Sequence, residues 1–219
     1  MSDRKSPRLA TQLVRGGINR SAHKETSEAI WMTSGFVYDS AEEADARFAG
    51  TSPGFLYGRY ANPTVRILEE KLMLLEGAEE CLCVGSGMAA VTASVMGVVK
   101  AGDRVIAPRA LFSSCLWLLE NFLPRFGVEV ELVDGEDLEQ WKKAAQKPVR
   151  LALIETPSNP VLGAVDLQAV AEILKPTGAI IVVDNVFATP LNQKPLELGA
   201  HVVVYSTTKH MDGQGRTLG

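Results

Sequence analysis

The sequence is short of cysteine, of histidine and of basic charge, and each shortage excludes a class of protein. Three cysteines, Cys81, Cys83 and Cys115, are too few for a disulfide framework. No second cysteine pair or histidine cluster accompanies Cys81 and Cys83, so buried packing is favoured over a metal or redox role. Lys and Arg number 22 against 26 Asp and Glu, with no basic patch, so nucleic acid is not an expected partner.

Long apolar runs are missing as well. Residues 1–17 carry charge but no apolar stretch of the kind found in signal peptides. No run in the chain is long enough to cross a bilayer, so we expect a cytoplasmic protein with no membrane partner. What the chain does contain is 46% hydrophobic residues over 219 positions, without an internal repeat. This is enough for a sizeable globular core.

Short apolar runs alternate with amphipathic segments through most of the chain. The predicted strands are 80–84, 104–107, 128–133, 149–155, 180–183 and 202–205. The predicted helices are 41–49, 63–76, 85–99, 112–126, 138–145 and 167–174. Residues 1–40 are weakly periodic and predict an extended arm. The alternation predicts an α/β fold of three layers, with a mostly parallel sheet between two layers of helices.

Polar chemistry follows two of these apolar runs. Asp184 ends the run 180–183, and Ser206, Thr208 and Lys209 follow the run 202–205. Open α/β sheets bind ligands at the carboxyl ends of their strands. Taken singly, these residues have ordinary explanations, such as a solvated lysine or a turn. Together, an amine, a carboxylate and hydroxyl donors suit pyridoxal 5'-phosphate (PLP), which needs a Schiff base, a partner for its ring nitrogen and donors for its phosphate.

A second anion site is predicted at the start of the helix 85–99. Gly87 and Met88 would present backbone N–H groups there, which can hold an anion without a basic side chain. Gly85, Gly87 and Ala90 also fit the dinucleotide fingerprint, but a lone match is weak. An NAD site also needs an acidic residue at the end of the following strand to bind the ribose, and here that strand ends at Pro108. NAD binding is therefore excluded, while NADP binding remains an alternative.

Four sequence motifs resemble those of the Cys/Met-metabolism family of PLP enzymes, which comprises cystathionine γ-synthases, γ- and β-lyases and homoserine-ester sulfhydrylases. They are DNVFATP, YSTTKHMDGQGR, YGRYANPTVR and EGAE. The resemblance runs from about Leu9 to the last residue and is greatest to the O-succinylhomoserine sulfhydrylases. It implies the large domain of a fold type I PLP-dependent transferase. Residues 1–60 would form an arm and a loop for a neighbouring subunit, 61–219 the PLP-binding domain, and a small C-terminal domain would be missing.

The resemblance also implies a role for each candidate site residue. Lys209 would form the Schiff base and shuttle protons, and Asp184 would keep the ring nitrogen protonated. Phe112 would stack on the ring, at a position that is commonly Tyr in the family, and Asn159 would lie beside the 3'-oxygen. The phosphate would contact the neighbouring subunit's Tyr57 and Arg59, which implies a dimer at least. The resemblance implies a homotetramer built as a dimer of dimers. The other phosphate contacts would be Ser86, Gly87, Met88, Ser206 and Thr208.

The implied reaction is γ-replacement on an acyl-homoserine in methionine biosynthesis. O-succinylhomoserine and sulfide would give homocysteine and succinate. The departing carboxylate is a stable anion that needs little help from an acid, which gives a reason why Phe112 can lack the tyrosine hydroxyl. The alternatives are cystathionine γ-synthase, O-acetylhomoserine sulfhydrylase, methionine γ-lyase, a non-catalytic assembly module and an NADP-binding protein. The module is considered because no Arg in the chain matches the one that grips the substrate carboxylate in the family.

Overall fold

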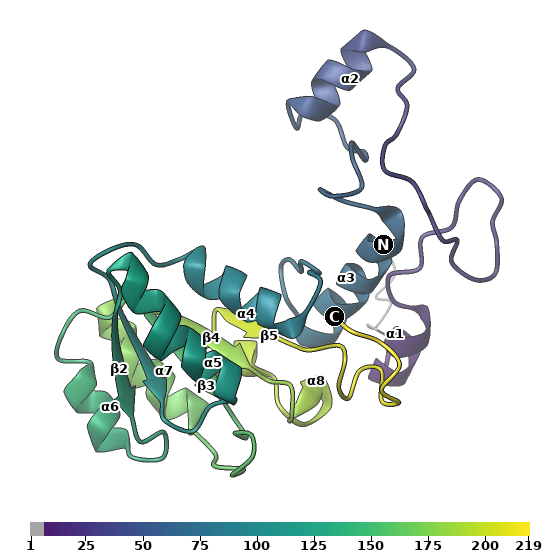
Figure 1. The fold of residues 1–219 in the computed structure, drawn as a ribbon. Coiled ribbons are helices and arrows are strands. Elements are labelled where there is room, and N and C mark those ends of the chain that lie inside the picture. Colours follow the sequence, from purple (N-terminus) through teal and green to yellow (C-terminus); the bar gives the residue numbers. More distant parts are fainter. Residues whose placement is uncertain (1–6) are drawn as a thin grey trace. The chain divides into compact units, whose positions relative to one another are not determined.

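The computed structural model describes residues 7–219 (Figure 1). The chain divides after Cys83 into two compact units, Met1–Cys83 and Val84–Gly219. Each unit is described by itself below. The expected boundary between residues 60 and 61 stays a prediction.

The described residues of the first unit, 7–83, contain three helices, α1 (Leu9–Arg15), α2 (Ala41–Phe48) and α3 (Pro63–Glu76). The predictions of α2 and α3 are confirmed. Helix α3 begins where the Asn62 side chain accepts a hydrogen bond from the Thr64 N–H, with Pro63 in the first turn. It ends at Gly77, whose φ of 71° lies in the left-handed region that favours glycine.

Helix α1 lies inside the segment that was expected to be an extended arm, and that expectation is wrong for Leu9–Arg15. The reason is packing between segments far apart in sequence. A Cβ atom placed on Gly16, the residue after α1, would lie 2.9 Å from a methyl carbon of Leu74 in α3. Local periodicity could not reveal this contact.

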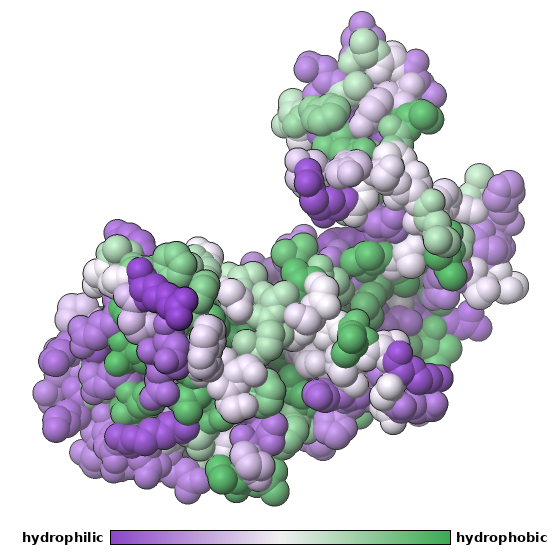
Figure 2. Space-filling view, in the orientation of Figure 1, coloured by the Kyte–Doolittle hydropathy of each residue, from purple (hydrophilic) through white to green (hydrophobic). Residues whose placement is uncertain are grey.

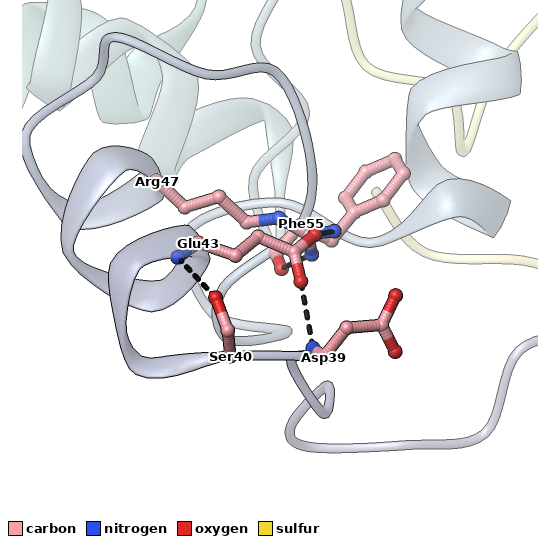
Figure 3. A network of polar contacts seen from close by, with 5 residues as sticks. All are labelled: Asp39, Ser40, Glu43, Arg47 and Phe55. Atoms are coloured by element: carbon pink, nitrogen blue, oxygen red, sulfur yellow. Dashed lines mark hydrogen bonds and ion pairs between the residues drawn. The ribbon is translucent and has the colours of Figure 1, made fainter.

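A reciprocal cap fixes the start of α2 (Figure 3). The Ser40 hydroxyl accepts a hydrogen bond from the Glu43 N–H at 3.1 Å, and the Glu43 carboxylate accepts one from the Asp39 N–H at 2.7 Å. Arg47, one turn further along, pairs with Glu43 at 2.5 Å and donates to the Phe55 carbonyl at 3.3 Å. The helix is thereby tied to the chain that follows it.

The first unit exposes large apolar side chains, and hydrophobic residues are visible on its surface in Figure 2. Met32 is 94% exposed, Val37 92% and Ile30 78%. Side chains of this size are normally covered, so the unit has apolar surface available for contact with another protein surface.

The second unit is built on a sheet of five parallel strands in the order β2-β1-β3-β4-β5. The strands are β1 (Arg104–Pro108), β2 (Glu129–Val133), β3 (Leu151–Glu155), β4 (Ile180–Asp184) and β5 (Val202–Val204). The helices are α4 (Gly87–Met96), α5 (Ser113–Trp117), α6 (Leu138–Ala144), α7 (Leu167–Leu174) and α8 (Thr189–Asn192). Short 3-10 turns cover Lys175–Thr177 and Pro195–Leu198. The predicted parallel α/β sheet is confirmed.

Two separate cores lie on the two faces of this sheet. On one face Val105 and Leu153 pack with residues of α4 and α5. On the other face Ile106 and Ile154 pack with α6 and α7, including the fully buried Trp141. Adjacent residues of one strand therefore serve opposite cores, as the twofold repeat of a strand requires. This gives the three layers that the sequence predicts.

Two predicted elements differ in the structure. Residues Glu80–Val84 form no strand in the described part of the chain, and Leu82 is 74% exposed, because an apolar run becomes a strand only with a neighbour to bond to. The predicted helix 112–126 changes after α5 into a π-helical turn, Leu118–Phe122, and a 3-10 turn, Leu123–Phe126. Pro124 has no N–H to donate, which prevents a regular continuation.

No helix among residues 7–219 is long and apolar enough to cross a membrane. The same residues contain no group of three or more His, Cys, Asp or Glu placed to hold a metal ion.

Candidate functional site

The candidate site lies where the strands of the second unit end. Glu155 is paired with Asp184 across β3 and β4, and Asp184 is paired with Val204 across β4 and β5. The chain leaves β1 and β3 toward opposite faces of the sheet, so their ends form the switch point at which open α/β sheets bind ligands. Phe112 follows β1, and Asn159 follows β3.

Asp184 is a partly buried carboxylate without a cation partner among the described residues. Its side chain accepts a hydrogen bond from the Val186 N–H at 3.1 Å, and no lysine, arginine or histidine among residues 7–219 forms an ion pair with it. Burial raises the pKa of Asp184 above its ordinary value, and the Val186 hydrogen bond only partly offsets this. A positively charged ligand group beside Asp184 would therefore stabilise its ionised form.

Glu155 is a second acid beside Asp184, and the sequence reasoning missed it. Its residue is 5% exposed. Burial, and then the negative charge of Asp184, raise the pKa of Glu155 to about 7. The available signal was its position, because Glu155 ends an apolar strand just as Asp184 does.

The α4 N-terminus approaches the end of β5 closely. The Ser86 hydroxyl caps the helix by accepting a hydrogen bond from the Ala89 N–H at 3.1 Å. A Cβ atom on Gly87 would lie 2.8 Å from the Ser206 Cβ, so only glycine allows this approach. The N–H groups of Gly87 and Met88 have no hydrogen-bond acceptor within the described chain. Two unused donors and a hydroxyl thus lie together.

The loop after β5 carries the candidate lysine. Lys209 is exposed, and its backbone N–H donates to the Ser206 carbonyl at 3.2 Å. The hydroxyls of Ser206 and Thr208 donate to the Gly219 carbonyl at 3.4 and 3.5 Å. A phosphate at these hydroxyls would take the place of that carbonyl.

A buried amide network supports the same edge of the sheet, and sequence reasoning missed it too. Asn185 is fully buried and donates to the Tyr205 hydroxyl at 2.6 Å and to the Gln193 carbonyl at 2.9 Å. The Gln193 side chain donates to the Thr156 carbonyl at 2.9 Å. The network joins the chain segments that follow β3, β4 and β5.

Tyr57 and Arg59 lie in the first unit. The Arg59 guanidinium carbon is 5.3 Å from the ring centres of both Tyr57 and Tyr60, and both tyrosines are exposed. Arg59 forms no ion pair within residues 7–219. The stacked tyrosines hold a free guanidinium at the surface of this unit.

The second unit thus carries nine of the eleven candidate residues on the chain segments that leave its sheet and at the α4 N-terminus: Ser86, Gly87, Met88, Phe112, Asn159, Asp184, Ser206, Thr208 and Lys209. The dinucleotide fingerprint lacks its context, because the segment before Gly85 is not a strand.

Comparison with known proteins identifies the family. The model of the Cys/Met metabolism PLP-dependent enzymes matches residues 10–219. The chain belongs to this family. A relative named O-succinylhomoserine sulfhydrylase from Mycobacterium tuberculosis is 51% identical over 96% of this chain and 52% of its own length. A relative of the same name from Pseudomonas aeruginosa is 44% identical over 100% of this chain and 54% of its own length. An L-methionine gamma-lyase from Fusobacterium nucleatum is 40% identical over 94% of this chain and 53% of its own length.

Two solved structures share the fold of this chain. The crystal structure of metB from Corynebacterium glutamicum superposes with a TM-score of 0.89 at 32% identity, over 96% of this chain and 53% of that one. A putative O-acetylhomoserine (thiol)-lyase from Campylobacter jejuni, solved with a pyridoxyl-lysine monophosphate, superposes with a TM-score of 0.91 at 28% identity. The match covers 96% of this chain and 52% of that one. The chain spans about half the length of the relatives it matches.

Proposed function

We propose that the protein catalyses PLP-dependent γ-replacement on O-succinylhomoserine, with sulfide as the acceptor and homocysteine and succinate as products. The observation that carries the proposal is Asp184, a partly buried carboxylate at the end of β4 that pairs with no cation among residues 7–219 and lies beside the strand that leads to Lys209. The higher identity to the two sulfhydrylases than to the methionine γ-lyase supports the choice of substrate.

The residues of the second unit fit PLP. A protonated pyridine nitrogen would supply the positive charge that Asp184 lacks, and the free N–H groups of Gly87 and Met88 with the Ser206 hydroxyl would supply donors for a phosphate. Bound PLP provides the electron sink for removal of a proton next to the amino group of the substrate. The exposed Phe112 offers an aromatic face for stacking.

The protein's own groups would divide the work as follows. Asp184, in its ionised form, would keep a proton on the ring nitrogen. Lys209 would hold the cofactor through its Nζ and would accept and donate protons at that atom. Ser86, Thr208 and Asn159 complete the contacts to the phosphate and to the 3'-oxygen. The leaving succinate needs no proton donor, so Phe112 can serve without a hydroxyl.

A visible absorption band tests the cofactor. The band should form when the protein is incubated with PLP and be absent from the Lys209→Ala variant. Lys175→Ala is the matched control, because Lys175 is an exposed lysine at the end of α7 and outside the candidate site. Loss of the band in both variants, or in neither, would contradict the role of Lys209.

Turnover assays test the substrate. Succinyl and acetyl esters of homoserine are compared with sulfide and with cysteine as acceptor, and methionine is tested alone. We expect the highest kcat/KM for the succinyl ester with sulfide. Highest activity with cysteine, with the acetyl ester or with methionine alone would assign one of the other family activities. A band without any turnover would favour the non-catalytic module. The cytoplasmic location and the homotetramer stay predictions.

A further inference from the structure

Glu155 accepts two backbone hydrogen bonds, each from a chain segment that follows a different strand. One carboxylate oxygen accepts from the Phe112 N–H at 2.5 Å, and the other accepts from the Asn159 N–H at 3.2 Å. Phe112 belongs to the segment between β1 and α5, and Asn159 to the loop after β3. A single side chain therefore joins the two segments that leave the switch point of the sheet.

The surroundings of Glu155 disfavour an ionised carboxylate, so its presence there calls for a structural reason, which its two hydrogen bonds supply. It is buried, it lies beside Asp184 in the next strand, and no cation among residues 7–219 pairs with it. Burial and a like charge both disfavour its ionised form. A neutral side chain of similar volume would avoid this cost, but no apolar or amide side chain offers two oxygen acceptors.

We propose that Glu155 is a positioning residue that fixes Phe112 and Asn159 relative to each other and to Asp184, so that the ring of the cofactor meets a preformed site. The inference rests on the proposed function. Glu155 has no contact with the cofactor in this proposal. It acts through the backbone of the two residues that we assign to the ring face and the 3'-oxygen.

The test uses Glu155→Gln, which keeps the size of the side chain but leaves one acceptor oxygen for two N–H donors. The matched control is Glu69→Gln. Glu69 is also buried, at 7% exposure, and accepts a backbone hydrogen bond, from the Cys83 N–H at 2.9 Å, but neither Cys83 nor its ion-pair partner Arg66 is a candidate cofactor residue.

Two measurements are made on each protein. Amide hydrogen exchange in the cofactor-free protein follows the Phe112 and Asn159 N–H groups directly. Titration with PLP gives the dissociation constant and the pH dependence of the visible band. In Glu155→Gln we expect faster exchange at one or both amides, roughly tenfold weaker PLP binding, as the loss of one charged hydrogen bond implies, and a shifted band titration. Glu69→Gln should change none of these.

Each outcome decides a separate point. Unchanged exchange at both amides would show that Glu155 does not hold them, and faster exchange with unchanged PLP affinity and band titration would show that the tie does not serve the cofactor. If the unmodified protein forms no Lys209-dependent band, the proposed function fails whatever the variants do, and the positioning role fails with it. Should Glu155→Gln not fold, Glu155→Asp is measured instead, because it keeps the charge but is one methylene too short to reach both amides.

Discussion

Gly87 and Ser206 approach so closely that a Cβ atom on Gly87 would lie 2.8 Å from the Ser206 Cβ and 3.2 Å from its Cα. The start of α4 and the end of β5 come from segments more than a hundred residues apart, yet they meet at the same edge of the sheet. The candidate phosphate donors depend on this approach, because they are contributed by both segments.

Substitution Gly87→Ala should therefore weaken PLP binding. The added methyl group must push α4 away from Ser206, at a cost of about 1–3 kcal/mol in the free energy of unfolding, as is typical of overpacking. Thermal unfolding and PLP titration measure the two effects. Gly85→Ala is the control, because a Cβ atom on Gly85 meets nothing within 4 Å. Equal behaviour of the two variants would contradict the steric argument.

A second prediction concerns the pH dependence of stability. The fold raises the pKa of Glu155 from 4.5 to about 7, so the folded state holds its proton more tightly than the unfolded state does. This contribution to stability is complete below pH 4.5 and is lost as the pH rises to about 7. The facing titratable groups are Asp184 on β4 and Cys115 on α5, whose pKa values are raised as well.

Urea unfolding of the cofactor-free protein tests this between pH 4 and pH 8. Relative to Glu155→Gln, the unmodified protein should lose on the order of 3 kcal/mol of unfolding free energy across that window. The comparison removes the contribution of groups that titrate alike in both proteins. If the difference in unfolding free energy between the two proteins is the same at every pH, the fold does not raise the pKa of Glu155.

The amide network gives a third prediction. In Asn185→Ala, the Gln193 carbonyl loses the donor that Asn185 supplies, and the Gln193 side-chain amide loses the Asn185 oxygen that accepts from it. Loss of hydrogen bonds to such partly buried groups costs about 1 kcal/mol each, so a fall in melting temperature of several degrees is expected. Asn192→Ala, at an exposed asparagine seven residues later, should have almost no effect. A similar fall in both would mean that the network is not the cause.

Strand-end chemistry was the part of the site that the sequence could predict. Two short runs of β-branched residues predicted adjacent parallel strands, and Asp184 ends the first of these strands while Lys209 lies in the loop after the second. Glu155 occupies the equivalent position on β3 but was missed. Its importance comes from the Phe112 and Asn159 amides, which are 43 and 4 residues away in sequence, and no local pattern specifies the first of these.

The errors in the fold have the same origin. Leu9–Arg15 is helical beside α3, and Glu80–Val84 is apolar but has no strand partner within the described chain. In both cases the conformation depends on a neighbour distant in sequence. Pro124 is different, because the sequence itself shows that this residue has no N–H to donate. The irregular end of the predicted helix 112–126 could therefore have been predicted from the sequence.

The last prediction concerns shared sites. We expect Arg59 to hold the phosphate in the neighbouring subunit's site, since it is held over two exposed tyrosine rings without an acidic partner among residues 7–219. Arg59→Ala and Lys209→Ala should each be inactive alone. After mixing and reassembly, about a quarter of the unmodified activity should return, because half of randomly paired dimers hold one intact site of two. A mixture of Asp184→Ala with Lys209→Ala is the control and should stay inactive, since we assign both residues to the site of their own subunit. No recovery in the first mixture, with dimers present, would place Arg59 outside the shared site.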